Sequence, residues 1–318
     1  SLGIKRWDRD DYDIDIVTVD LRGIVTPADP PNTIGPEDGG IDYVVIGAAL
    51  PADLDVDVYG SNDGNTVRGH DGFGNFFGGS LDIVGGNSSD ILIGGGGPTQ
   101  IWGGPGVDLL QAGRGTSDLY GGDDTDYLFG LDASAGPPTF AGGKFVGGEG
   151  SDAIIVGSVS RGNFILIGGE INSTDDAGGN FIVGGYGNDQ IFAGNVTNGS
   201  GYTADLSSGL SSILIGGPGY DKIFGSPFTD ITVGGWLGIN SEANIAYSGR
   251  DEITAGDGDD ILVASNGVVL PNPTRLVATE VDQHLGAGLT EILNGGGGND
   301  LFVLGPNDST VMANGGSE

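Results

Sequence analysis

The chain has 318 residues, of which 66 are glycine, and its 44 acidic and 11 basic residues give a formal net charge of −33. This charge repels phosphate, so nucleic acid is a poor partner, and no apolar run approaches the about 20 residues of a membrane-spanning helix. The glycines have no three-residue period, which excludes collagen, and 37% apolar residues in short β-branched clusters argue against disorder. Divalent cations would relieve the self-repulsion of so acidic a fold. The absence of cysteine fits an extracellular bacterial protein without disulfides.

Residues 1–60 are predicted to form an N-terminal β-rich segment. The stretch 12–21 alternates Asp with Ile and Val, which indicates a strand with one acidic face. A Pro-rich connection follows at 26–40, and further strands are expected at 41–50 and 53–60. No convincing helical period occurs anywhere in the chain. We expect this segment to cap the fold or to donate a strand to another copy.

From Gly85 to Gly130 the sequence repeats with a period of nine, as in GGNSSDILI and GGPGVDLLQ, and residues 60–69 look like a degenerate entry into the repeat. The register is marked by Gly85, Gly94, Gly103, Ala112, Gly121 and Gly130. Further copies begin at Gly147, Gly184, Gly216, Gly225, Ala255 and Gly295. After Gly130 the register breaks, so we divide the chain into 1–60, a regular part at 61–130 and an elaborated part with loop insertions at 131–318.

The repeat has a physical interpretation of its own. Its first six positions must turn sharply, which glycine permits, and its last three are extended with one side chain pointing inward. Two nonapeptides then make one coil, and stacked coils pair their strands in parallel around a thin aliphatic core. Bound ions in the turns would have to add stability to so thin a core. The inward residues are predicted to be Leu92, Ile101, Leu110, Leu119, Leu128, Ile154, Ile191, Ile223, Leu262 and Phe302.

These segments resemble the RTX (hemolysin-type) calcium-binding nonapeptide, GGxGxDxUx with a large aliphatic residue at U. Six copies match it fully or with one Ala for Gly, namely those that start at 103, 147, 184, 216, 255 and 295. The resemblance implies an all-β parallel β-roll, or β-solenoid, with Ca²⁺ between successive turns. It implies that the metal ligands are Asp90, Asp108, Asp126, Asp152, Asp189, Asp221, Asp260 and Asp300. Capping of the turns by these aspartates without metal is the alternative interpretation.

The spacing of the aspartates predicts on which edge of the roll they lie. Asp90, Asp108 and Asp126 are 18 residues apart, so they should stack along one edge, and a calcium ladder is expected there. The other edge should carry Thr99, Ser117 and Ala135, which are not carboxylates. This one-sided arrangement departs from the two-sided pattern of the family, and Asp118 is a candidate ligand shifted by one position.

The elaborated part is predicted to keep its well-formed turns on a single edge. These turns end in Asp189, Asp221, Asp260 and Asp300. Long insertions at about 193–211 and 264–290 are expected on the opposite edge, where insertions into a solenoid often form a contact face.

Catalysis is not expected. Carboxylate pairs arise by chance among 44 acidic residues, no common catalytic motif occurs, and His70 and His284 are interpreted as surface residues. Trp7, Trp102 and Trp236 could act as sugar platforms, although packing on the face of the roll is the simpler role for Trp102.

The predicted function is that of an extracellular structural protein that assembles with copies of itself into a filament, surface layer or matrix. The repeat stops at Asn314-Gly315-Gly316 without a cap, so either the chain is a trimmed piece or a neighbouring copy covers its end, head to tail. The alternative is a calcium-folding module of a larger secreted adhesin or exoenzyme. A third class, a polysaccharide-active enzyme, is disfavoured by the scarcity of Lys, Arg and His. Surface polysaccharide is a further candidate partner.

Overall fold

The computed structural model describes residues 16–20, 42–48, 50, 52–60, 64–70, 75–130, 141–157, 162–173, 178–198, 201–205, 209–235, 251–263, 267–269, 276–278, 291–303 and 311–315. All its regular elements there are β-strands. The described part therefore contains no helix that could cross a membrane.

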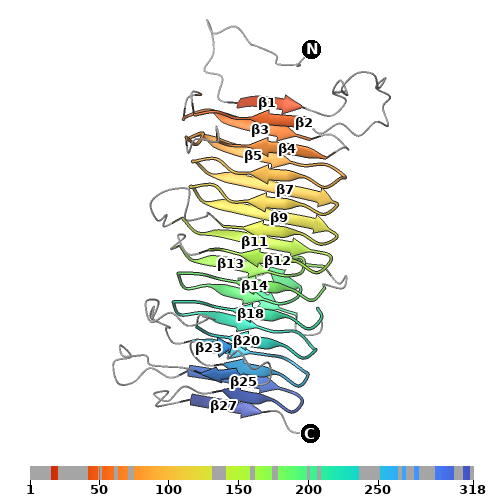
Figure 1. Cartoon of the computed structure of the whole chain (residues 1–318), viewed down its shortest axis with the longest axis vertical. Coiled ribbons are helices and arrows are strands. Elements are labelled where there is room, and N and C mark those ends of the chain that lie inside the picture. Colours follow the sequence, from red (N-terminus) through yellow and green to blue (C-terminus); the bar gives the residue numbers. More distant parts are fainter. Residues whose placement is uncertain are drawn as a thin grey trace, which may run out of the picture.

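The chain winds back and forth between two parallel sheets, and each coil contributes one strand to each sheet (Figure 1). Sheet A contains, in order, β1 (Ile16–Asp20), β3 (Asp55–Tyr59), β5 (Ser80–Val84), β7 (Thr99–Pro105), β9 (Ser117–Asp123), β11 (Gly143–Gly148), β13 (Phe164–Ile167), β15 (Gln190–Phe192), β19 (Lys222–Phe224), β21 (Glu252–Thr254), β25 (Glu291–Gly296) and β27 (Val311–Gly315). Sheet B contains β2 (Asp42–Val45), β4 (Asn65–Arg68), β6 (Ile91–Ile93), β8 (Leu109–Gln111), β10 (Tyr127–Phe129), β12 (Ala153–Ile155), β14 (Phe181–Val183), β18 (Ile213–Ile215), β20 (Ile231–Val233), β22 (Ile261–Val263) and β26 (Leu301–Val303). The predicted all-β parallel β-roll is confirmed.

A thin aliphatic core fills the space between the sheets. Leu92, Leu110 and Leu128 pair in register along sheet B, and Ile101 pairs with Leu119 along sheet A. All five side chains are fully buried. Of the other predicted inward residues, Ile154, Ile191, Ile223 and Leu262 are also fully buried, and Phe302 packs partly buried against the same cluster. The inward positions predicted from the nine-residue period are therefore confirmed.

The N-terminal strands belong to the same two sheets as the repeats. β1 and β3 pair in parallel in sheet A, and β2 pairs with β4 in sheet B. Val56 and Val58 of β3 extend the buried core, in register with Leu81 and Ile83 of β5. The division into 1–60, 61–130 and 131–318 stays a prediction about domains.

The turns of the roll define two edges. Turns that lead from sheet A to sheet B lie along one edge, called here the AB edge, and turns that lead from B to A lie along the BA edge. The insertion at 193–211 follows β15 and precedes β18, so it leaves the AB edge, and it contains the hairpin of β16 (Val196–Asn198) and β17 (Tyr202–Ala204).

The two long insertions do not share an edge. The stretch 264–290, which includes the paired strands β23 (Gly267–Val269) and β24 (Leu276–Ala278), joins β22 of sheet B to β25 of sheet A and so belongs to the BA edge. The prediction that both insertions lie on one edge is wrong, because an odd number of half-coils separates them.

Candidate metal centre

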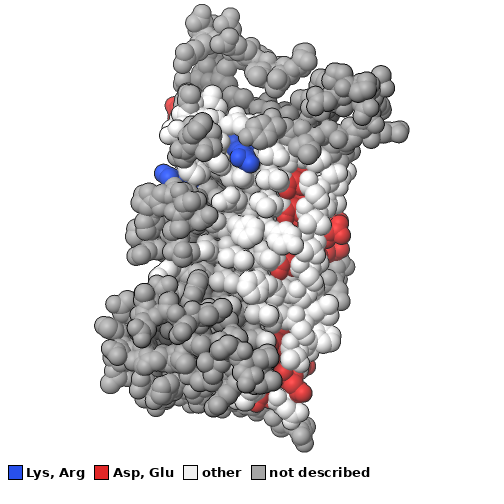
Figure 2. All heavy atoms as spheres, viewed as in Figure 1, with Lys and Arg blue, Asp and Glu red and all other residues white. Residues whose placement is uncertain are grey.

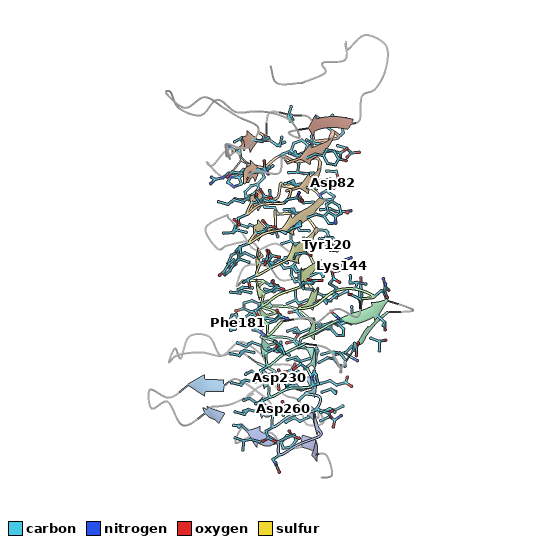
Figure 3. The ribbon with its side chains drawn as sticks, turned by 90° about the vertical axis from the view of Figure 1, so that its right-hand side faces the viewer. Asp82, Tyr120, Lys144, Phe181, Asp230 and Asp260 are labelled. Carbon is cyan, nitrogen blue, oxygen red and sulfur yellow. The ribbon has the colours of Figure 1, made fainter. Side chains whose placement is uncertain are left out.

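One residue of each AB turn stands at or directly before the start of a strand of sheet B, and these residues form a continuous column, called here the AB column. In chain order it consists of Asn65, Asp90, Asp108, Asp126, Asp152, Asn180, Ser212, Asp230, Asp260 and Asp300. The predicted stacking of Asp90, Asp108 and Asp126 is confirmed by the register of β6, β8 and β10. Figure 3 labels Asp230 and Asp260, which lie on successive coils.

A ladder of hydrogen bonds links the members of the AB column. Asp108 Oδ1 accepts the backbone N–H of Asp90 at 2.7 Å, and Asp126 Oδ1 accepts that of Asp108 at 2.8 Å. The same contact recurs from Asn65 to Asp300, with Ser212 Oγ as the acceptor at its own rung. Because each Oδ1 satisfies a buried backbone donor of the neighbouring coil, the carboxylate is held in one orientation.

That orientation turns the second carboxylate oxygen toward a backbone carbonyl. A Cβ built on Gly103 would collide with Asp108 Oδ2 and would lie 2.6 Å from the carbonyl oxygen of Gly121 in the next coil. Gly85, Gly121 and Gly147 meet an aspartate Oδ2 and a following carbonyl in the same way. The first glycine of the repeat is thus needed for this close approach, whereas the second and fourth positions supply positive φ, as at Gly104 (105°) and Gly106 (124°).

At each of these positions the aspartate Oδ2 and a backbone carbonyl oxygen lie close together. Both are hydrogen-bond acceptors, so a proton or a cation is needed between them. Oδ2 is buried and accepts no hydrogen bond in Asp90, Asp108, Asp126, Asp152, Asp189, Asp260 and Asp300. Burial raises the pKa of Asp108 to about 7 and that of Asp126 to about 8, from an ordinary value of 3.8. Deprotonation in this setting is costly unless a cation compensates the charge.

The donor set is that of a hard cation. Calcium takes several oxygen ligands from carboxylates and backbone carbonyls, and both are present beside each first glycine. Among the described residues no three His, Cys, Asp or Glu side chains gather as a metal-holding group. The carbonyls of the glycine turns lie beside the orphaned Oδ2 atoms, and together these oxygens are the ligands that fit a calcium ion.

The BA edge carries a second, shorter column. Phe164 N–H donates to Asp189 Oδ1 at 2.8 Å, Asp189 N–H to Asp221 Oδ1 at 2.8 Å, and Asp221 N–H to Asp251 Oδ1 at 2.9 Å. The prediction that Asp189, Asp221, Asp260 and Asp300 share one edge is wrong. Two strands, β20 and β21, lie between β19 and β22, so Asp260 falls on the edge opposite to Asp221.

The regular part of the BA edge has hydroxyl groups at the corresponding positions, as predicted for Thr99 and Ser117. Thr99 Oγ1 accepts the N–H of Gly95 and donates to the carbonyl of Gly97, both at 3.3 Å. Both side chains are buried. Gly143, and not Ala135, pairs with Ser117; the coil is lengthened there, and Ala135 lies outside the described residues.

Sequence reasoning missed five members of the two columns: Asn65, Asn180, Ser212, Asp230 and Asp251. Asp230 and Asp251 precede ITV and EIT as the recognised aspartates precede their strands, and that signal could have found them. Asn65, Asn180 and Ser212 lack a carboxylate, so no residue pattern marks them. Asp118 is not in a column: it is an outward residue of β9 whose Oδ1 accepts the N–H of Lys144 at 3.1 Å.

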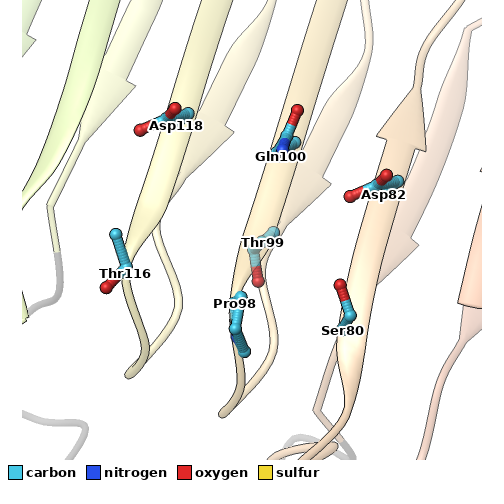
Figure 4. A pocket seen from close by; sticks show the side chains of 7 residues that line it. All are labelled: Ser80, Asp82, Pro98, Thr99, Gln100, Thr116 and Asp118. Atoms are coloured by element: carbon cyan, nitrogen blue, oxygen red, sulfur yellow. The ribbon is translucent and has the colours of Figure 1, made fainter. Parts of the chain in front are cut away.

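The outer face of sheet A carries aromatic and polar rows. Trp102 and Tyr120 stack with ring centroids 5.6 Å apart, and Lys144 Nζ lies 4.9 Å from the centroid of Tyr120. Figure 4 shows a hollow on the same sheet, lined by Ser80, Asp82, Pro98, Thr99, Gln100, Thr116 and Asp118 on three adjacent coils. In the view of Figure 2 the acidic side chains of the described residues gather toward one edge of the roll, and basic side chains are few. Trp7, Trp236 and His284 lie outside the described residues.

Fold and columns together define a class: a parallel β-roll whose glycine turns present carboxylate and carbonyl oxygens to a cation. The chain carries the RTX calcium-binding nonapeptide repeat, whose family model matches four copies at residues 82–101, 102–133, 174–195 and 245–268. Calcium is thus the cation for which these repeats are built. No curated protein and no solved structure matches the chain.

Proposed function

We propose that this calcium-binding β-roll is an extracellular structural protein whose copies join head to tail through the open ends of their sheets. One observation carries the proposal. In the described part of the chain, sheet A ends in β1 and β27 and sheet B ends in β2 and β26, and each of these strands has a single neighbour in its sheet.

Such ends are suited to each other. All strands of sheet A run parallel, so a second copy displaced along the axis of the roll would place its β1 beside β27 in the same direction. The free backbone N–H and C=O groups of a terminal strand are a template for another strand. Because the two ends differ, the contact is heterologous and propagates into a fibre instead of closing as a dimer.

The extracellular placement rests on charge and ion supply. A chain with a net charge of −33 needs cations to remain compact, and extracellular calcium modules bind with Kd values of about 10⁻⁴–10⁻³ M. Sites of that affinity fill only where the calcium concentration reaches a similar value, as it does outside the cell. A non-catalytic role accords with 11 basic residues and two histidines in the whole sequence.

The same open ends also support the alternative, a calcium-folding module of a larger secreted adhesin or exoenzyme. In that case further coils of one longer chain would continue the two sheets. Light scattering and negative-stain microscopy of this chain in calcium and in chelator separate the two. Fibres that form in calcium and dissolve in chelator support self-assembly, whereas monomers at high concentration in calcium favour the excised module.

Surface polysaccharide is a second partner that one feature favours. Trp102 and Tyr120 stack on β7 and β9, two residues beyond Gln100 and Asp118, which line the polar hollow of Figure 4. An aromatic face on the same strands as hydroxyl and amide groups suits a neutral sugar. Sedimentation of the protein with insoluble cell-wall polysaccharide tests this, with Trp102→Ala expected to reduce binding. Unchanged sedimentation of that variant would remove the aromatic pair from consideration.

A further inference from the structure

Asn180 occupies the rung of the AB column between Asp152 and Ser212, and its amide makes a contact that a carboxylate cannot make. Asn180 Oδ1 accepts the N–H of Asp152 at 2.7 Å, as each aspartate Oδ1 does for its own neighbour. Asn180 Nδ2 donates to the carbonyl oxygen of Ala193 in the next coil at 2.7 Å and to that of Gly178 at 3.2 Å.

The amide nitrogen stands in the place of a carboxylate oxygen. A Cβ built on Gly168 would collide with Asn180 Nδ2 and with the Ala193 carbonyl oxygen, just as one on Gly147 would meet Asp152 Oδ2 and the Gly168 carbonyl oxygen. The two rungs therefore have the same geometry. They differ in one respect: the amide supplies a hydrogen to the carbonyl, and the carboxylate supplies none.

Asn65 repeats this arrangement at the other end of the column. Its Nδ2 donates to the carbonyl oxygen of Gly85 at 3.3 Å and to Asp90 Oδ1 at 2.9 Å. A Cβ built on Gly60 would collide with the carbonyl oxygen of Gly85 and would lie 2.7 Å from Asn65 Nδ2. Two separate rungs thus replace the carboxylate by an amide in the same position.

The two rungs after Asn180 are also satisfied within the protein. Ser212 Oγ accepts the N–H of Asn180 at 3.0 Å and donates to the carbonyl oxygen of Leu210 at 2.9 Å. Asp230 Oδ2 accepts the N–H of Ser226 at 2.6 Å, and its Oδ1 accepts the N–H of Ser212 at 2.6 Å. The AB column therefore has four carboxylates with an orphaned oxygen, then three satisfied rungs, then two more such carboxylates.

We propose that Asn180, Ser212 and Asp230 form a calcium-independent joint that divides the AB column into two separately loading calcium arrays, Asp90–Asp152 and Asp260–Asp300, with the amide of Asn180 in place of the ion. This rests on the proposed calcium role of the carboxylate rungs. Asp152 and Asp260 are four rungs apart, about 19 Å at the usual strand spacing of about 4.8 Å. A solenoid couples only neighbouring coils strongly, so three rungs that need no ion leave the two arrays weakly coupled.

The test is calcium titration of the full chain carrying Asp189→Asn and Asp221→Asn, which removes the BA-edge carboxylates next to β14 and β18 but keeps their Oδ1 acceptors. Hydrogen exchange with mass spectrometry and equilibrium dialysis for the number of bound ions follow. In chelator, β14 and β18 should exchange more slowly than β8, β10 and β12, and the two arrays should gain protection at different calcium concentrations. If protection rises in a single step along the whole column, including β14 and β18, the joint does not exist although the calcium role stands. If calcium changes protection nowhere, the proposed calcium sites themselves fail.

Variants sharpen the test. Asn180→Asp should add calcium at saturation, make the protection of β14 calcium-dependent and bring the titrations of the arrays closer together. Asp126→Asn should lower the number of bound ions and raise the protection of β10 in chelator. Asp123→Asn, the same change at an exposed carboxylate of the same turn, is the matched control and should leave both readouts unchanged. An Asn180→Asp variant whose calcium count and exchange pattern equal those of the parent would refute the role assigned to the amide.

Discussion

Gly121 shows why single residues of the repeat tolerate so little change. A Cβ at this position would collide with Asp126 Oδ2 and would lie 2.5 Å from the carbonyl oxygen of Gly147. We expect Gly121→Ala to lower the free energy of unfolding by about 1–3 kcal/mol, the usual cost of overpacking. Gly47→Ala is the control, because nothing lies within 4 Å of its Cβ, and it should stay within about 0.5 kcal/mol. Guanidinium unfolding in calcium measures both, and equal midpoints would contradict the close approach.

Asp108 and Thr99 allow the two edges to be compared at one residue each. Asp108→Ala removes the acceptor of the buried Asp90 N–H and a carboxylate that faces the Gly121 carbonyl, so it should cost about 1–3 kcal/mol in calcium. Thr99→Ala removes two long hydrogen bonds within one turn and should cost about 1 kcal/mol, the same with calcium or chelator. A calcium-dependent cost at Thr99 and none at Asp108 would reverse the assignment of the edges.

At the scale of the column, the buried carboxylates predict an unusual pH dependence of the calcium-free protein. Burial raises the pKa of Asp152 and Asp260 to about 7 and that of Asp126 to about 8, above the ordinary 3.8. The folded state thus binds more protons than the unfolded state between these values, so the free energy of unfolding should fall as pH rises from about 5 to about 8. Calcium binds the deprotonated carboxylates and should flatten this dependence. A Tm in chelator that rises with pH would contradict the prediction.

The elements of this fold could be predicted from sequence because the nine-residue period determines both the inward residue and the turn. The position of each residue within the nonapeptide makes Leu110 face the core and makes Asp108 end a turn. The 18-residue coil then places Asp108 beside Asp90 and Asp126. The assignment of edges failed beyond Gly130 because it depends on counting every half-coil between two turns. Asn180 could not be recognised at all, since its partner Ala193 is a neighbour only once the lengthened coils are in register.

For the whole molecule, charge and core together predict that calcium and folding are coupled. The core is a single, largely aliphatic layer between two sheets, and the net charge of −33 opposes compaction. A ligand that binds only the folded state adds its binding free energy to stability. We therefore expect excess chelator to remove most of the β signal in circular dichroism and calcium to restore it. An unchanged spectrum and Tm in chelator would show that the turns are stable without the ion.

Head-to-tail assembly of whole molecules can be tested through β1. This strand pairs with β3 through one side and forms the terminal strand of sheet A among the described residues, and β27 lies at the other end of the same sheet. If β1 of one copy joins β27 of the next, deletion of residues 1–22 should abolish long species in light scattering.

The deletion leaves β3 and every later strand of both sheets in place, so the shortened chain should still fold in calcium with a similar circular dichroism spectrum. New fibres could then form only if β3 replaces β1 as the docking strand, which would appear as assembly with a raised critical concentration. Assembly of the deleted chain at the same concentration as the intact one would exclude β1 from the contact. A monomeric intact chain would favour the excised module, because the sheet ends would then be the places where a longer chain continues.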